Sequence, residues 1–134
     1  MSLLFLFLAC GESYESPAAS SAQGVSEYTQ GMWGERTRTV QAGLEEAAAL
    51  AAEERSEEAA ALLVAIYEGS FEPELEWVIR RDLGAQEAMV LEFQFGRLRQ
   101  ALEQGGDVAS QVATLMESLN QTAALLDEKQ VMWP

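Results

Sequence analysis

The chain has 134 residues, 22 acidic against 8 basic side chains, no histidine and one cysteine, and its formal net charge is −14. This length allows one domain, while the lack of histidine and of a second cysteine excludes a Ser-His-Asp triad, an ordinary zinc site, an internal disulfide and a CxxC redox pair. The acidity excludes nucleic acid as an expected partner, because binding to phosphates requires clustered lysine and arginine, and a ligand held by charge is expected to be a cation.

The first feature along the chain is a short apolar run, LLFLFLA, over residues 3–9, followed by Cys10. It is far shorter than the roughly 20 residues of a membrane span and is typical of a signal peptide. The apolar run followed by Ala9 and Cys10 resembles the lipobox of bacterial lipoproteins, in which the cysteine is lipidated. We therefore expect a signal peptide at residues 1–9, lipidation of Cys10, and a lipid-anchored location in the cell envelope, periplasmic or on the outer surface. The alternative is a buried N-terminal strand or helix.

Residues 10–39 are rich in serine, glycine, alanine and threonine and show no helical or strand period. Such a composition predicts a flexible tether. From Val40 the composition changes to alanine and glutamate, which are helix formers, and no proline interrupts the chain before Glu68. We expect one long helix over residues 40–68, ended by Gly69-Ser70, and a helical domain over residues 40–130.

A short helix is expected next, because Pro73 suits the first turn of a helix and Leu75, Val78 and Ile79 follow at helical spacing. It is predicted to end near Arg81-Asp82.

Two helices with heptad-like apolar seams are predicted in the C-terminal part. The first seam is Ala88, Leu91, Phe95, Leu98 and Leu102, and the second is Val108, Val112, Leu115, Leu119, Thr122 and Leu126. Between them, Gly105-Gly106 predicts a helix end and Asp107 an N-cap, so the two helices form a tight antiparallel hairpin. The expected fold class is all-α: an antiparallel bundle of about four helices, one long, one short and then the hairpin.

Carboxylates gather at two places in the expected helical body. Glu72, Glu74 and Glu76 lie at alternate positions around Pro73, and Glu53, Glu54, Glu57 and Glu58 form a second cluster. Glu72 and Glu76 share a helix face, where like charges repel unless a cation or an arginine neutralises them. Carboxylates from different helices of a bundle are a usual iron or manganese site, and hard cations accept all-oxygen ligands. The alternative is a solvated acidic face.

The stretch from Glu57 to Leu126 resembles a known family, the extracytoplasmic helical extension of bacterial high-affinity, oxidase-dependent iron permeases. The similar segments are AAALLVAIYEGSFEPELE, IRRDL and LEFQFGRLRQALEQGGDVASQVATLMESL. Tyr67, Phe71, Glu72 and Pro73 match the turn signature of the family, and Glu92, Leu98 and Arg99 match the signature of the third helix. The resemblance implies an iron-related role outside the cytoplasm, in which Glu72 and Glu92 bind metal or deliver it to a permease.

Two functions therefore compete. The first is a tethered domain that binds or delivers iron or another hard cation, with Glu72, Glu92, Glu76, Glu58 and Tyr67 as candidate ligands. The second is a structural or protein-interaction lipoprotein without a metal site. The expected partner is an iron permease or another envelope protein, with the lipid anchor as the only membrane contact. No nucleophile–base pair, phosphate loop or organic-cofactor motif is present, so an enzyme is not expected. A ferroxidase-like di-iron enzyme is disfavoured because no Glu-x-x-His pair occurs.

Overall fold

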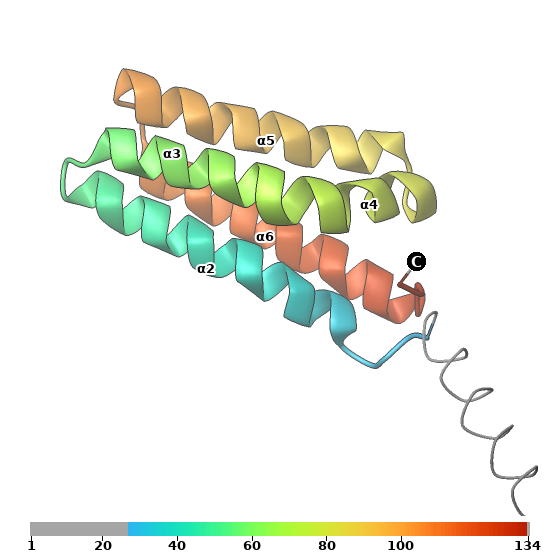
Figure 1. Cartoon of the computed structure of the whole chain (residues 1–134). Helices are drawn as coiled ribbons and strands as arrows, with labels where there is room; N and C mark the ends of the chain where they lie inside the picture. The colour runs from blue at the N-terminus through green and yellow to red at the C-terminus, as the bar shows by residue number, and fades with distance from the viewer. Residues whose placement is uncertain (1–26, 134) are drawn as a thin grey trace, which may run out of the picture. The chain divides into compact units, whose positions relative to one another are not determined.

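The computed structural model describes residues 27–133, of which residues 30–131 form one compact unit. This unit is helical throughout (Figure 1), and no strand occurs among the described residues. Its elements are α2 (Met32–Ala52), α3 (Ser56–Ile66), the π-helix η1 (Tyr67–Glu76), α4 (Trp77–Asp82), α5 (Ala85–Gln104) and α6 (Val108–Glu128). The expected signal peptide, Cys10 and most of the expected tether lie outside the described residues.

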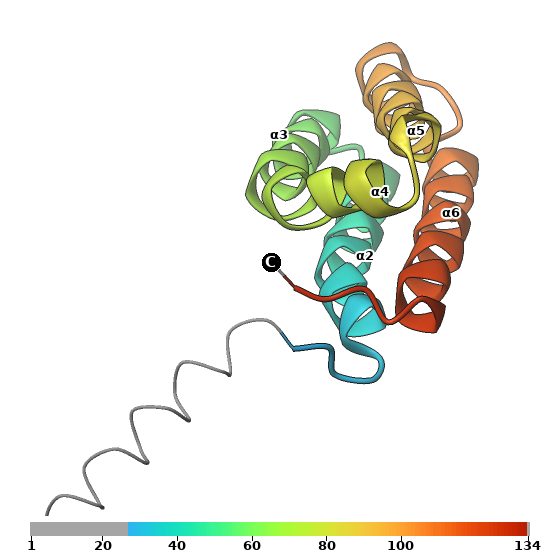
Figure 2. The same cartoon turned by 90° about the vertical axis from the view of Figure 1, so that its right-hand side faces the viewer.

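The unit is an antiparallel bundle of four helices, as the sequence predicts. The segments α3, η1 and α4 follow one another without a break and act as one helix of the bundle (Figure 1). Seen end-on, the four helices surround a common core (Figure 2). In this arrangement α2 packs against α3 and α6, and α5 packs against the same two helices.

The expected single helix over residues 40–68 is wrong, because the chain reverses at Glu53–Arg55. Glu54 takes a left-handed conformation with φ of 63°, and α2 and α3 pack side by side. The physical reason is burial: between Ala52 and Ala59 no apolar residue is present, so only a reversal lets the apolar faces on both sides share one core. The two helices approach closely at Gly43, where an added Cβ would lie 2.4 Å from the Cδ1 atom of Ile66.

The expected helix end at Gly69-Ser70 is also wrong, since these residues lie inside η1. Pro73 lies in the same element. A proline removes a backbone donor, and its ring crowds the carbonyl four residues earlier in an α-helix. The wider π-helical winding carries the chain past Pro73 without a turn. Phe71 and Leu75 remain buried along it, with exposures of 0% and 2%.

The prediction that residues 32–39 belong to the tether is wrong, because α2 starts at Met32 and these residues are helical. Trp33 is fully buried, and its indole N–H donates to the carbonyl oxygen of Val131 at 2.7 Å. The backbone N–H groups of Trp33 and Gly34 donate to the carboxylate of Asp127 on α6, at 3.1 and 3.0 Å. A side chain distant in sequence thus caps α2, whose N-cap residue Gly31 has no side chain to do so.

The hairpin of α5 and α6 agrees with the sequence prediction. Gly105 ends α5 in the left-handed conformation, with φ of 78°, and Asp107 caps α6 by accepting a hydrogen bond from the N–H of Ser110 at 3.1 Å. Every residue of the predicted α5 seam is buried, and so are all residues of the α6 seam except Val108, which is half-buried. The two seams supply one side of the core.

Candidate functional site

Two glutamates from different helices meet at one arginine on the face between η1–α4 and α5. Arg80 donates to Oε1 of Glu76 at 3.1 Å, and the same nitrogen donates to Oε1 of Glu92 on α5. The hydroxyl of Tyr67 donates to the other carboxylate oxygen of Glu76 at 3.3 Å. We refer to Tyr67, Glu76, Arg80 and Glu92 as the Glu76–Glu92 cluster.

The winding of η1 and the position of Phe71 place these side chains. Phe71 packs against Tyr67 and Phe95, with ring centroids 5.4 and 4.8 Å apart, and Tyr67 meets Phe95 edge-on at 5.2 Å. The three rings fix the side of η1 that faces α5. As a result, the phenol of Tyr67 reaches toward Glu76, and Glu76 toward Arg80, one helical turn further along.

Within the cluster, the pKa values of Glu92 and Tyr67 are both raised. The pKa of Glu92 is raised, first by burial and then by hydrogen bonding and repulsion from the Glu76 carboxylate, while Arg80 opposes the change only in part. Burial raises the pKa of the Tyr67 phenol to about 12, with further contributions from the charges of Glu76, Glu92 and Glu72. Negative charge is therefore in excess here, even with Arg80 present.

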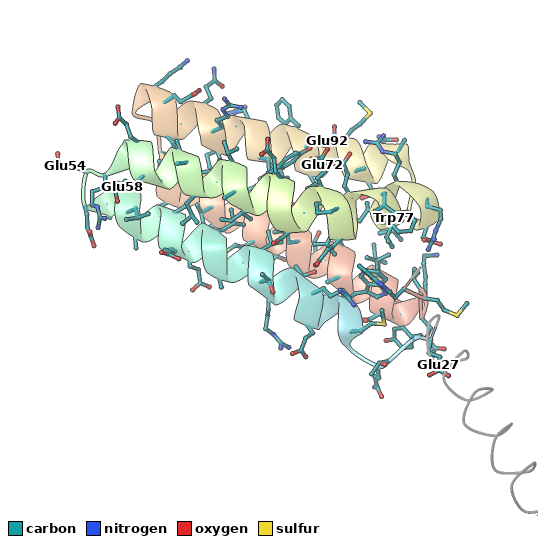
Figure 3. The ribbon with its side chains drawn as sticks, viewed as in Figure 1. Glu27, Glu54, Glu58, Glu72, Trp77 and Glu92 are labelled. Carbon is teal, nitrogen blue, oxygen red and sulfur yellow. The ribbon has the colours of Figure 1, made fainter. Side chains whose placement is uncertain are left out.

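The five candidate ligands predicted from the sequence are only partly brought together. Tyr67, Glu76 and Glu92 belong to the cluster, and Glu72 is exposed next to it, near enough for its charge to act on Tyr67. In the view of Figure 3, Glu72 and Glu92 project near each other about midway along the helices, whereas Glu58 lies at the end where α2 and α3 join. There Glu58 pairs with Arg55.

Arg80 is the functional residue that sequence reasoning missed. In the prediction from the sequence Arg80 has no role, and only its neighbours Arg81-Asp82 are named, as a helix end, whereas the structure makes Arg80 the counter-ion of two glutamates. A signal for it exists, because Glu76 and Arg80 are four residues apart on one helix, the spacing of a helical ion pair. Nothing local, however, indicates that Glu92 on the next helix shares this arginine.

A groove of about 280 Å³ lies beside the cluster, between α3–η1 and α5. Tyr67 and Glu92 contribute to its wall, and Glu68 and Arg99 add charged groups at its edge. The remaining wall is apolar or bare: Leu63, Val64, Phe95 and Gly96. A small ligand in this groove would therefore contact both the Tyr67 phenol and the Glu92 carboxylate directly.

The donor atoms of the cluster fit a hard cation, because two carboxylates and a phenol are all oxygen ligands. Within residues 27–133, no group of three or more acidic, cysteine or histidine side chains is arranged to hold a metal ion. The positive charge at the site comes from Arg80. A metal ion would thus have to take the place of this guanidinium between Glu76 and Glu92.

The raised pKa of Glu92 predicts a pH dependence of folding. A carboxyl group with a raised folded-state pKa binds a proton more readily in the folded chain, so its stabilising contribution is present below the ordinary value near 4.5 and is lost as pH rises through the folded-state pKa. We expect the free energy of unfolding to increase as pH falls from 7 toward 5. In Glu92→Gln this increase should be smaller, as measured by urea denaturation at several pH values.

The matched control is Glu103→Gln, which removes an exposed carboxylate from the same helix and should keep the wild-type pH dependence. Parallel curves for the wild type and Glu92→Gln would contradict the prediction. The groups that face Glu92 are Glu76, Arg80 and the phenol of Tyr67.

No protein-family model, curated protein or solved structure matches this chain. The resemblance to the extension of iron permeases therefore stays a prediction from the sequence. Among the described residues, no helix combines the length and apolar character that crossing a membrane requires.

Proposed function

We propose that this chain is an envelope-tethered helical domain that binds a hard metal cation, with iron as the first candidate, at the Glu76–Glu92 cluster. The observation that carries the proposal is the meeting of two carboxylates from different helices at a single positive charge, next to a phenol. The permease resemblance supports iron as the metal and delivery to a permease as the role. The apolar run before Cys10 supports a lipid anchor in the cell envelope.

Binding would proceed by exchange of cations at the site. The side chain of Arg80 is 43% exposed, whereas that of Glu76 is 17% exposed. The guanidinium can therefore move into solvent while the carboxylate of Glu76 stays in place. A divalent or trivalent cation carries more charge than the guanidinium and would relieve more of the repulsion that raises the pKa of Glu92. Glu72, beside the cluster, is the available additional carboxylate.

The test is calorimetric titration of the purified chain with MnCl2 and with ferric citrate. We expect saturable binding by the wild type and its loss in the Glu76→Gln, Glu92→Gln double variant, which keeps shape and removes two charges. Arg80→Ala should bind at least tenfold more tightly, because the competing cation is gone. Glu45→Gln with Glu46→Gln removes two exposed charges from α2 and is the matched control.

Two results would contradict the proposal. One is the absence of saturable wild-type binding tighter than about 1 mM, the range in which weak carboxylate sites bind calcium. The other is equal loss of binding in the control and in the cluster variant, which would mean that the cation responds only to the net charge of −14. Circular dichroism of each variant shows whether the helices are intact.

A second candidate function is protein–protein interaction, the other possibility left open by the sequence. A specific observation favours it: Met89 and Phe93 on α5 are 58% and 64% exposed. Large apolar side chains that gather on one surface mark contact sites. This function does not exclude the metal site, because the two surfaces lie on different sides of α5.

A further inference from the structure

The helix α5 is apolar on two opposite sides. Its inner side carries the buried seam of the core, and its outer side carries Met89, Val90 and Phe93, which are 58%, 45% and 64% exposed. These three residues are spaced by one to four positions and so share one helical face. From Met89 to Arg97 this face extends for about 12 Å, or two helical turns.

A groove of about 540 Å³ runs along this face toward α6. Its wall consists of the three apolar side chains, Arg97 and neutral polar side chains such as Gln94 and Gln111. None of the described residues that line it carries a carboxylate. In a chain with 22 acidic residues, this groove is lined by one positively charged side chain and by no negatively charged one.

Arg97 differs from every other arginine of the chain. In the described part of the protein, six of the seven arginines have a carboxylate within 4.0 Å. Arg97 has none, and its guanidinium instead lies over the ring of Phe93, 5.8 Å from the centroid. The groove therefore offers an arginine that stacks on an exposed aromatic ring and has no acidic partner within the bundle. Phenylalanine, methionine and arginine are the residue types enriched at protein interfaces.

Arg97 and the net charge of the chain indicate which kind of partner fits the outer face of α5. In a symmetric dimer the same face would meet itself, so Arg97 would meet a second Arg97 or neutral side chains, and two chains of charge −14 would be brought together. An anionic lipid surface is disfavoured for the same reason, because a single arginine does not offset that repulsion. A foreign helix with apolar anchors and a carboxylate satisfies both the apolar groove and Arg97.

We propose that the outer face of α5 docks an amphipathic helix of another protein, which places apolar side chains against Met89, Val90 and Phe93 and a carboxylate against Arg97. Docking of a helix in an apolar groove uses anchors at spacings of three, four and seven residues, which fit the two turns available. This surface is separate from the Glu76–Glu92 cluster and does not depend on the metal proposal.

The experiment uses two synthetic, fluorescein-labelled helical peptides with the same leucine stripe, one with glutamate and one with lysine beside the stripe. Binding to the purified chain is measured by fluorescence anisotropy. We expect the glutamate peptide to bind at least tenfold more tightly than the lysine peptide. Arg97→Glu should reverse this preference, and Phe93→Ala should weaken the binding of the glutamate peptide at least tenfold. The matched control is Arg99→Glu, because Arg99 already pairs with Glu103, and it should keep the wild-type preference.

The proposal is overturned if neither peptide binds at 1 mM, if both bind equally, or if Arg99→Glu changes the preference as much as Arg97→Glu does. A dimer in sedimentation equilibrium that Phe93→Ala abolishes would assign the face to a second copy of this chain instead. Co-sedimentation with phosphatidylglycerol vesicles that is lost in Phe93→Ala would assign it to a membrane. Titration of Phe93→Ala with MnCl2 reports on the metal site separately, so each proposal can fail without the other.

Discussion

Replacement of Trp33 by alanine should destabilise the bundle by about 3–5 kcal/mol, the usual loss for a buried large aromatic side chain. Trp33 is fully buried near the start of α2. Its indole N–H also donates to the carbonyl of Val131 at 2.7 Å, so the variant loses a hydrogen bond as well as apolar contacts. The loss is a large fraction of the roughly 5–15 kcal/mol that stabilises a domain. Urea denaturation followed by circular dichroism measures it.

Trp77→Ala is the matched control for this prediction. Trp77 is 38% exposed, and its indole N–H donates to the carbonyl of Pro73 in η1, which continues directly into α4. We expect a loss of about 1 kcal/mol or less at this partly exposed position. If Trp33→Ala costs no more than Trp77→Ala, residues 32–39 do not belong to the folded bundle.

Phe71→Ala is expected to have a similarly large effect, about 3–5 kcal/mol. Phe71 is fully buried and packs against the rings of both Tyr67 and Phe95, so its removal opens a cavity beneath the Glu76–Glu92 cluster. The substitution also removes the ring that packs against Tyr67. Because Tyr67 is part of the cluster, the affinity for Mn²⁺ should fall as well. Thermal and urea denaturation measure the first effect, and calorimetry the second.

The control for Phe71→Ala is the same substitution at an exposed position, Phe93→Ala. Phe93 is 64% exposed, and the loss of its contact with Arg97 is expected to cost about 1 kcal/mol or less. Equal destabilisation by the two variants would contradict the assignment of Phe71 to the core. Phe71→Leu keeps an apolar side chain at the site and should recover part of the loss.

The candidate site was predictable in part. The sequence drew attention to Tyr67, Glu72, Glu76 and Glu92 through their spacing and through the resemblance to a permease extension. Their contacts were not predictable in the same way, because the spacing of residues within one segment does not determine which side of the neighbouring helix they meet. The structure joins Glu76 rather than Glu72 to Glu92, and it does so through Arg80.

The sequence by itself determined the all-α class and the hairpin of α5 and α6. In that hairpin the apolar seams, the glycine at the end of α5 and the cap at Asp107 are local features that all favour the same structure, and local physics decides such a case.

Only the tertiary structure decided the reversal at Glu54, the continuation of the chain through η1 and the start of α2 at Met32. At each place burial overruled the local preference. Glutamate and alanine favour one long helix over residues 40–68, but the apolar faces before and after Glu54 must share a core. Phe71 and Leu75 are buried along η1, and Trp33 is buried near the start of α2. The cap of α2 comes from Asp127, and the partner of the Trp33 indole is Val131. Both lie at the other end of the sequence, so these contacts exist only once the bundle has formed.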